Sequence, residues 1–252
     1  MYNLGPAKGA RVLVAGGCGG IGREVVAALA AGGAQVAVLD LERSIREHPV
    51  PKGVRAHAVD AGDETSVAAA FAAVAKDWDG LEGFVNLVGF SPRLGPVAAM
   101  PAATWMDTVA GNLNAAFLLC RAAMPLLKKG KDAALVNTSS GLGLRSMPGY
   151  GPYSASKAGI VSLTKTLAME NAPAVRANAV APAAVDTQFL TGGTGRDPRE
   201  THIDLAAYVK AIPMGRVALA ADVVGPILFL LGPGSAYMTG QVLYLNGGML
   251  TP

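Results

Sequence analysis

Short apolar runs, rich in β-branched residues, alternate along the chain with longer stretches in which apolar residues recur at helical spacing. Short runs of this kind are typical of strands buried on both faces, and their alternation with helices is typical of a parallel sheet between two helical layers. The runs predict seven strands, at residues 11–15, 35–39, 55–59, 83–88, 133–138, 176–181 and 242–245. The helical stretches predict helices at residues 21–31, 64–76, 104–128, 153–171 and 221–231.

Local signals support these boundaries. Asp63 is a favourable N-cap for the second predicted helix, and Pro173 follows the end of the fourth. Because strand–helix–strand crossovers are right-handed, the sequence predicts an α/β fold of Rossmann type, a doubly wound seven-stranded parallel sheet with helices on both faces. Ligands are expected beyond the carboxyl ends of the strands. An α/β chain of 252 residues is expected to form a single domain over residues 1–252.

One segment, from residue 186 to about residue 212, does not follow the alternation. It contains a glycine-rich stretch, Pro198 and several charges, and it is too long and polar for an ordinary connection. It is therefore expected to be a mobile loop, and two interpretations are open. It is either a surface excursion or a lid in which Phe189 and Leu190 close over an apolar substrate, and its place near the strand ends favours the lid.

Composition narrows the function classes. The chain is 51% hydrophobic and 15% charged, with a formal net charge of +3, and its one basic cluster, Lys128, Lys129 and Lys131, is explained by a helix C-terminus. We therefore expect no nucleic-acid partner. Two cysteines and three scattered histidines predict neither a disulfide framework nor a metal site. The N-terminus lacks a signal-peptide core, and Asn112 and Arg121 interrupt the longest apolar stretch, so we expect a cytoplasmic protein without a membrane segment.

A glycine cluster follows the first predicted strand, where Gly16, Gly20 and Gly22 lead into the first helix. Glycine lets the backbone approach a pyrophosphate at a helix N-terminus, although tight turns need glycine as well. Asp40 ends the second predicted strand, where its carboxylate can bind the ribose hydroxyls of adenosine and repel a 2′-phosphate. Alone, such an aspartate is better explained by a surface turn between a strand and a helix. Together the residues favour NAD, and NADP stays open because Arg43 is close in the sequence.

Cys18 lies inside this glycine cluster. A helix N-terminus can lower the pKa of a thiol, which would suit a redox sensor. A small residue that fills a turn is the more common situation, so we assign Cys18 no chemistry.

Tyr153 and Lys157 are four residues apart, so in a helix the phenol and the ammonium share one face and the cation favours the phenolate. Alone, this pattern is common on surface helices. Ser139 and Ser140 follow the fifth predicted strand, and from composition either hydroxyl can face the same site. Asn112 interrupts an apolar helix, where an amide either faces solvent or pairs with a buried backbone group.

Together, these residues resemble the short-chain dehydrogenase/reductase family, and within it a 3-oxoacyl reductase-like member, over nearly the whole chain. Ala15, Leu87, Val88 and Ala183 depart from the family pattern, which affects loop shape more than chemistry. The resemblance rests on Gly16-x-x-x-Gly20-x-Gly22, Asp60, Asn86-Leu87-Val88-Gly89, Asn112, Ser140, Tyr153, Lys157, Thr187 and the ending Thr239-Gly240-Gln241…Asn246-Gly247-Gly248.

The resemblance implies an enzyme that interconverts a secondary alcohol and a ketone with NAD(H), with Tyr153 as the proton acid/base. It implies that Lys157 orients the cofactor and tunes the phenol, that Ser140 binds the substrate oxygen, and that Asn112 holds water for a proton relay. The implied cofactor contacts are Gly16, Cys18, Gly20, Ile21, Gly22, Asp40, Leu41, Asp60, Ala61, Asn86, Gly89, Tyr153, Lys157, Pro182, Val185 and Thr187.

The substrate is less defined. The residues expected to contact the substrate are mainly apolar, which suits a hydrophobic or ring-bearing alcohol, whereas Arg93 and Arg145 would suit an anion. The alternative function within the family is an NADPH-dependent 3-oxoacyl thioester reductase, and Asp40 favours the NAD-linked enzyme. The expected substrate contacts are Phe90, Leu142, Met147, Tyr150 and Phe189.

Functions of other classes remain to be weighed. A non-catalytic NAD-binding regulator would keep the fold without turnover, but the joint presence of the four catalytic residues argues against it. Ser154 and Lys157 also match the Ser-x-x-Lys pattern of acyl-transfer enzymes, whose other motifs are missing from the sequence. The helices at 104–128 and 153–171 are apolar on more than one side, and the resemblance implies that they pair subunits into a homotetramer or a homodimer.

Overall fold

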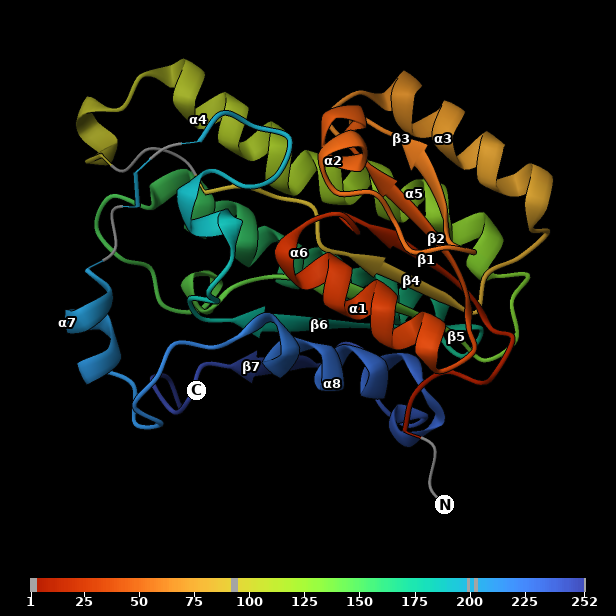
Figure 1. Ribbon diagram of the computed structural model, residues 1–252. Coiled ribbons are helices and arrows are strands. Elements are labelled where there is room, and N and C mark those ends of the chain that lie inside the picture. Colours follow the sequence, from red (N-terminus) through yellow and green to blue (C-terminus); the bar gives the residue numbers. More distant parts are fainter. Residues whose placement is uncertain (1–3, 92–94, 199, 202–203, 252) are drawn as a thin grey trace.

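The computed structural model describes residues 4–91, 95–198, 200–201 and 204–251. Its strands form one parallel sheet in the order β3-β2-β1-β4-β5-β6-β7 (Figure 1). The strands are β1 (Arg11–Ala15), β2 (Gln35–Asp40), β3 (Arg55–Ala58), β4 (Gly83–Asn86), β5 (Ala133–Thr138), β6 (Val175–Pro182) and β7 (Val242–Leu245). The predicted seven-stranded parallel sheet is therefore confirmed.

Helices cover both faces of this sheet (Figure 1). On one face α1 packs against α8, and on the other α3 packs against α5, with α6 beside them. The helices are α1 (Gly20–Ala31), α2 (Glu42–Glu47), α3 (Glu64–Asp77), α4 (Ala102–Val109), α5 (Ala115–Leu127), α6 (Gly151–Asn171), α7 (Leu205–Lys210) and α8 (Ala220–Leu231).

The two core layers follow from the alternation of side chains along each strand. In β1, Val12 and Val14 pack with α1 and α8, whereas Leu13 and Ala15 pack with α3 and α5, and all four are fully buried. Because both faces of a parallel strand are covered, successive residues are all apolar and no polar face appears in the sequence. This burial explains the unbroken apolar runs.

Several boundaries differ from the prediction. The short helices α2 and α7 were not predicted, because six residues are too few to show helical periodicity. The predicted helix at 104–128 begins earlier, at Ala102, and contains a π-helical segment, Ala110–Asn114, between α4 and α5. The strand predicted to reach residue 88 ends at Asn86, whose side-chain oxygen accepts a hydrogen bond from the backbone N–H of Val88 at 3.1 Å.

Among the described residues, one continuous helical stretch, Ala102–Leu127, is long and apolar enough to cross a membrane. In the most apolar window of this stretch, 44% of the residues are buried inside the protein. The buried side of α5 packs against the sheet and α3, which accounts for its apolar composition without a membrane.

The strand order places a crevice at the carboxyl ends of the central strands. β1 pairs with β2 on one side and with β4 on the other, so the direction of winding reverses between β1 and β4. In doubly wound folds, ligands bind beyond the carboxyl ends of the strands at this point of reversal. In Figure 1, α7 and the chain between β6 and α7 lie at this end of the sheet.

Candidate active site

A cavity of about 1130 Å³ opens at the carboxyl ends of the strands. Its wall includes the turn after β1, the ends of β2, β5 and β6, and the segment that follows β6. Nearly all the residues predicted to bind cofactor or substrate line this one cavity. Three predicted residues, Cys18, Asn86 and Asn112, are buried outside its lining.

The turn between β1 and α1 requires glycine for steric reasons. Gly16 has a φ of +78°, and a Cβ atom there would lie 3.0 Å from the carbonyl carbon of Leu87. A Cβ atom on Gly20 would lie 2.6 Å from Cβ of Thr187. α1 begins after Gly19 without a side-chain cap, so no side chain competes for the first backbone N–H groups. These groups are placed to bind a diphosphate, and the bare turn fits a dinucleotide.

Asp40, at the end of β2, lies in the part of the cavity where a ribose is expected. Its carboxylate accepts hydrogen bonds from the backbone N–H of Cys18 and of Leu41, both at 2.8 Å. Burial raises the pKa of Asp40, and these two hydrogen bonds act in the opposite direction. A carboxylate has about four lone-pair sites, so both oxygens can still accept a ribose hydroxyl. Asp60 and Ala61, after β3, line the cavity beside it.

Two residues predicted among the cofactor contacts have structural environments instead. The Cys18 side chain is buried, and burial raises the pKa of its thiol to about 12, so the thiol stays protonated and a redox-sensing thiolate is not supported. Its backbone N–H holds Asp40 in place. Asn86 donates to Oδ1 of Asn137 at 3.1 Å, and Asn137 donates in turn to Thr164 at 2.9 Å, so Asn86 ties β4 to β5 and α6.

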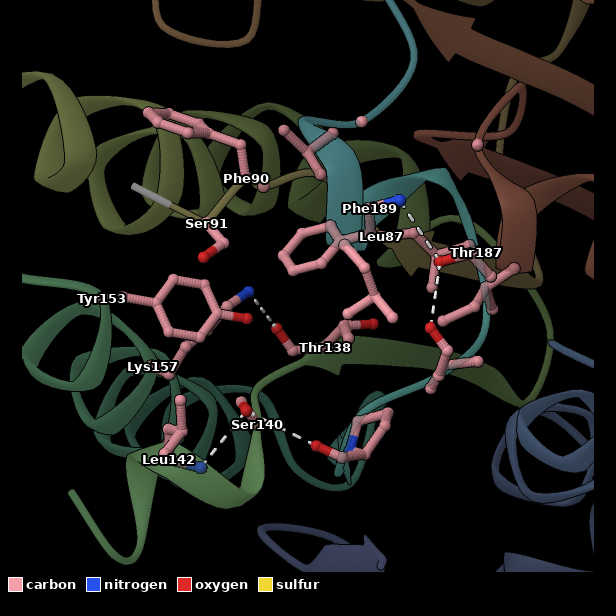
Figure 2. A pocket seen from close by; sticks show the side chains of 18 of the residues that line it. Leu87, Phe90, Ser91, Thr138, Ser140, Leu142, Tyr153, Lys157, Thr187 and Phe189 are labelled. Atoms are coloured by element: carbon pink, nitrogen blue, oxygen red, sulfur yellow. Dashed lines mark hydrogen bonds between the residues drawn. The ribbon is translucent and has the colours of Figure 1, made fainter. Parts of the chain in front are cut away.

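Tyr153 and Lys157 project from one face of α6 into the cavity, as their spacing predicted (Figure 2). Both are buried, and Nζ of Lys157 lies 5.5 Å from the centre of the Tyr153 ring. Lys157 donates a hydrogen bond to the carbonyl oxygen of Thr138, at the end of β5, at 3.0 Å. The ring of Phe189 faces that of Tyr153, with their centres 6.2 Å apart.

Burial dominates the ionisation of this pair. It raises the pKa of Tyr153, and hydrogen bonding with the Ser140 hydroxyl acts in the opposite direction. It lowers the pKa of Lys157 to about 8. That Lys157 favours the phenolate stays a prediction, because desolvation of the phenol is the largest influence on its pKa in the protein alone.

The structure distinguishes Ser139 from Ser140. The hydroxyl of Ser139 donates to the carbonyl oxygen of Lys157 at 2.7 Å, deep inside the protein. Ser140 is more open, and its hydroxyl contacts the carbonyl oxygen of Pro182 at 3.5 Å and accepts from the N–H of Leu142 at 3.2 Å (Figure 2). Ser140 thus keeps the freer hydroxyl at the cavity wall.

Asn112 is fully buried inside the π-helical segment. Its amide accepts from the N–H of Phe90 at 3.3 Å and donates to the carbonyl oxygens of Phe90 at 3.0 Å and Thr108 at 2.9 Å. Gly89 has a φ of +153°, and a Cβ atom there would lie 2.6 Å from Oδ1 of Asn112 and 3.2 Å from Nζ of Lys157. Asn112 and Lys157 therefore meet at the bare Cα of Gly89.

The expected substrate residues lie around the same space. Phe90, Leu142, Tyr150 and Phe189 line the cavity, and Met147 lies at its exposed rim. Arg93 lies outside the described residues, whereas Arg145 is a lining residue. Several further lining residues were not predicted, because they reach the cavity only through the folding of distant segments; among them are Arg196, Tyr208, Met249 and Leu250.

Known proteins are similar to this chain over nearly its whole length. The family model described as enoyl-(acyl carrier protein) reductase matches residues 16–250. The chain is 32% identical to the 3-oxoacyl-[acyl-carrier-protein] reductase FabG of Aquifex aeolicus, over 94% of the chain and 96% of that protein. It is also 32% identical to the D-threitol dehydrogenase of Mycolicibacterium smegmatis, over 94% of the chain and 91% of that protein.

Solved structures resemble this fold over nearly the whole chain. A short-chain type dehydrogenase/reductase from Mycobacterium ulcerans superposes with a TM-score of 0.85 at 26% identity, covering 97% of this chain and 90% of that one. A 3-ketoacyl-(acyl-carrier-protein) reductase from Brucella melitensis, complexed with NADH, gives 0.85 at 27% identity, covering 96% and 98%. The chain belongs to the short-chain dehydrogenase/reductase family of nucleotide-binding oxidoreductases.

Proposed function

We propose that this protein is an NAD(H)-dependent oxidoreductase that interconverts a secondary alcohol and a ketone, acting as a single cytoplasmic domain over residues 1–252. The observation that carries the proposal is the meeting of Ser140, Tyr153 and Lys157 in one cavity, with Asn112 and Lys157 both beside Gly89. These groups can transfer a proton and hydrogen-bond a substrate oxygen. The glycine turn before α1, in the same cavity, can bind the dinucleotide.

In this proposal, Tyr153 gives a proton to the carbonyl oxygen during reduction and takes it from the alcohol during oxidation. The bound nicotinamide supplies or accepts the hydride. Ser140 hydrogen-bonds the same oxygen as charge develops on it. Lys157 holds its position through its hydrogen bond to Thr138 at 3.0 Å, and a water held by Asn112 continues the proton relay from Lys157. Because burial raises the pKa of Tyr153 in the protein alone, positive charge arriving with an oxidised nicotinamide ring would favour proton removal.

NAD is the proposed cofactor because Asp40 presents a buried carboxylate where the ribose hydroxyls are expected. A 2′-phosphate there would meet a like charge with little solvent to screen it. Asp60 and Ala61 would border the adenine, and Thr187 the nicotinamide carboxamide. One similar enzyme, the reductase from Brucella melitensis, was solved with NADH.

A hydrophobic or ring-bearing alcohol is the proposed substrate, because Phe90, Tyr150 and Phe189 surround the space beside Tyr153. The second candidate is a 3-oxoacyl thioester reductase, which the similarity to the Aquifex aeolicus enzyme supports. The apolar residues that line the cavity suit the acyl group of a thioester as well as a ring.

The central test replaces Tyr153 by Phe, which keeps the ring and removes the proton. We expect kcat to fall by at least about 100-fold, within the usual contribution of a general acid, while NADH binding is unchanged. Tyr237→Phe is the matched control because Tyr237 is fully exposed. Wild-type turnover by Tyr153→Phe would contradict the assignment of the acid.

A screen of alcohols, ketones and 3-oxoacyl thioesters with both cofactors separates the candidates. Turnover of small or cyclic alcohols with NAD supports the first candidate, and preference for thioesters with NADPH supports the second. NADH binding without turnover on any substrate would favour a non-catalytic regulator.

We also propose a homotetramer, or a homodimer, formed through α4, α5 and α6. Phe117 on α5 is 45% exposed and Met169 on α6 is 85% exposed, although both helices already bury another side. Exposed apolar side chains on helices that also serve the core suit a contact between subunits. Sedimentation velocity measures the assembly directly.

A further inference from the structure

The chain between β6 and α7 does more than border the substrate space. After a 3₁₀ helix, Gln188–Thr191, residues 192–197 cross the cavity toward the cofactor side, and we name these six residues the strap. Three of them are glycines with positive φ, Gly192 at +118°, Gly193 at +91° and Gly195 at +71°. Only glycine adopts such a run of conformations without strain, so the backbone conformation of the strap requires its three glycines.

The strap lies against the diphosphate turn and the adenosine side of the dinucleotide site. A Cβ atom on Gly19, in the turn before α1, would lie 3.9 Å from Oγ1 of Thr194. Gly195 packs against the residue after Asp40, because a Cβ atom there would lie 3.0 Å from Cδ1 of Leu41. On the substrate side, the guanidinium of Arg196 stacks over the ring of Phe90, with its carbon 3.6 Å from the ring centre.

An ion pair fixes the far end of the strap. Asp197 accepts from Nη1 of Arg43 on α2 at 3.0 Å, across 154 positions of sequence. The same guanidinium binds Glu47, one turn further along α2, at 2.8 Å. Arg43 is thus engaged by two carboxylates only three residues after Asp40.

We propose that the strap closes over the bound dinucleotide and that Asp197 is a specificity-determining residue for NAD over NADP. The proposal rests on the NAD-linked function proposed above. In the proposal, Arg43, three residues after Asp40 and just outside the cavity lining, is the cation that a 2′-phosphate at the end of β2 recruits, and Asp197 occupies it. NADP would have to displace Asp197 from Arg43, and displacing Asp197 would lift the strap.

The ion pair acts through competition, not through its own strength. Asp197 is 95% exposed and Arg43 is 42% exposed, and a pair of this kind contributes little to folding. A 2′-phosphate carries close to two negative charges, so the carboxylate of Asp197 weakens its binding both by repulsion and by holding Arg43. NAD carries no such group, and for NAD the strap only slows release.

The test measures NADH and NADPH binding to the whole protein without substrate, by fluorescence titration for Kd and stopped flow for the dissociation rate. The variants are Asp197→Asn, Arg43→Gln and the double variant. Glu200→Gln is the control, because Glu200 is an exposed carboxylate of the same segment for which the described residues show no ion pair.

For Asp197→Asn we expect NADPH to bind about five-fold more tightly and NADH to dissociate about three-fold faster, the scale of one screened charge contact. Arg43→Gln should speed NADH release equally without tightening NADPH. In the double variant NADH should dissociate as in either single variant, and NADPH should lose the tightening that needs a free Arg43. Glu200→Gln should match the wild type.

The proposal is overturned if Asp197→Asn behaves like Glu200→Gln toward both cofactors. If NADPH tightens but NADH release is unchanged, closure by the strap is refuted. Failure of the underlying function is seen separately, in the wild type alone, as absence of turnover with any alcohol or as tighter binding of NADPH than of NADH.

Discussion

Gly89→Ala tests the point at which the cofactor crevice, Asn112 and Lys157 converge. Gly89 has a φ of +153°, and an L-residue with a left-handed backbone costs about 1–2 kcal/mol. The new Cβ atom would lie 2.6 Å from Oδ1 of Asn112, closer than such atoms approach, so Asn112 must move. Its movement breaks its two hydrogen bonds to Phe90, each worth about 0.5–1.5 kcal/mol. The free energy of unfolding should therefore fall by about 2–5 kcal/mol.

At about 2–4 °C per kcal/mol for a chain of this size, the melting temperature should drop by about 5–15 °C. The same Cβ atom lies 3.2 Å from Nζ of Lys157, and displacement of a catalytic group by about 1 Å can cost about 100-fold in rate. Thermal unfolding and steady-state kinetics on the alcohol found by the screen measure both effects.

Gly225→Ala provides the control for this experiment. Gly225 is an exposed residue inside α8 whose added Cβ atom would meet nothing within 4 Å. Because Gly225 precedes Pro226, whose ring crowds the Cβ atom of the preceding residue, alanine there should not bring the usual helix stabilisation, and it should leave turnover unchanged. If Gly89→Ala instead melts with the wild type and keeps its kcat, the convergence of Asn112 and Lys157 at Gly89 is wrong.

Two further predictions follow from charges in the fold. Lys157→Met should abolish turnover yet raise the melting temperature at pH 7. The pKa of Lys157 falls from 10.5 to about 8 on folding, so the buried cation costs stability below pH 8 and none above about pH 10.5. Equal melting temperatures of the variant and the wild type from pH 7 to pH 10 would contradict this. Glu82→Gln should lower the melting temperature at pH 7, because Arg11 binds Glu82 at 2.7 Å and lowers its pKa from 4.5 to about 2. A charge-assisted pair of this kind stabilises the fold by about 1–3 kcal/mol, and this stabilisation is present above pH 4.5 and lost toward pH 2. A difference in melting temperature between variant and wild type that persists at pH 2.5 would refute it.

The sheet could be predicted because its signal is local. Every strand of a doubly wound sheet is buried on both faces, so runs such as Val12-Leu13-Val14 identify it without knowledge of its neighbours. The spacing of Tyr153 and Lys157 is equally local, since four residues of helix bring two side chains to one face.

What the sequence could not show depends on distant contacts. The choice between Ser139 and Ser140 depends on the carbonyl oxygens of Lys157 and Pro182, which no local pattern reveals. Burial is the largest influence on the pKa of Tyr153, and burial is a property of the whole fold. The ion pair of Asp197 with Arg43 joins residues from opposite halves of the chain, so the contact between the strap and α2 was not predictable.

The π-helical segment that holds Asn112 also constrains how this chain can change in length. A π-helical turn accommodates one more residue than an α-helical turn, so the stretch from Ala102 to Leu127 carries an extra residue between two regular ends. Each residue of an α-helix turns the side chains by about 100°. Loss of a single residue between Ala110 and Asn114 would restore a regular helix and turn Asn112 away from Phe90, so a deletion that looks harmless in an alignment of helices would remove an amide from the site.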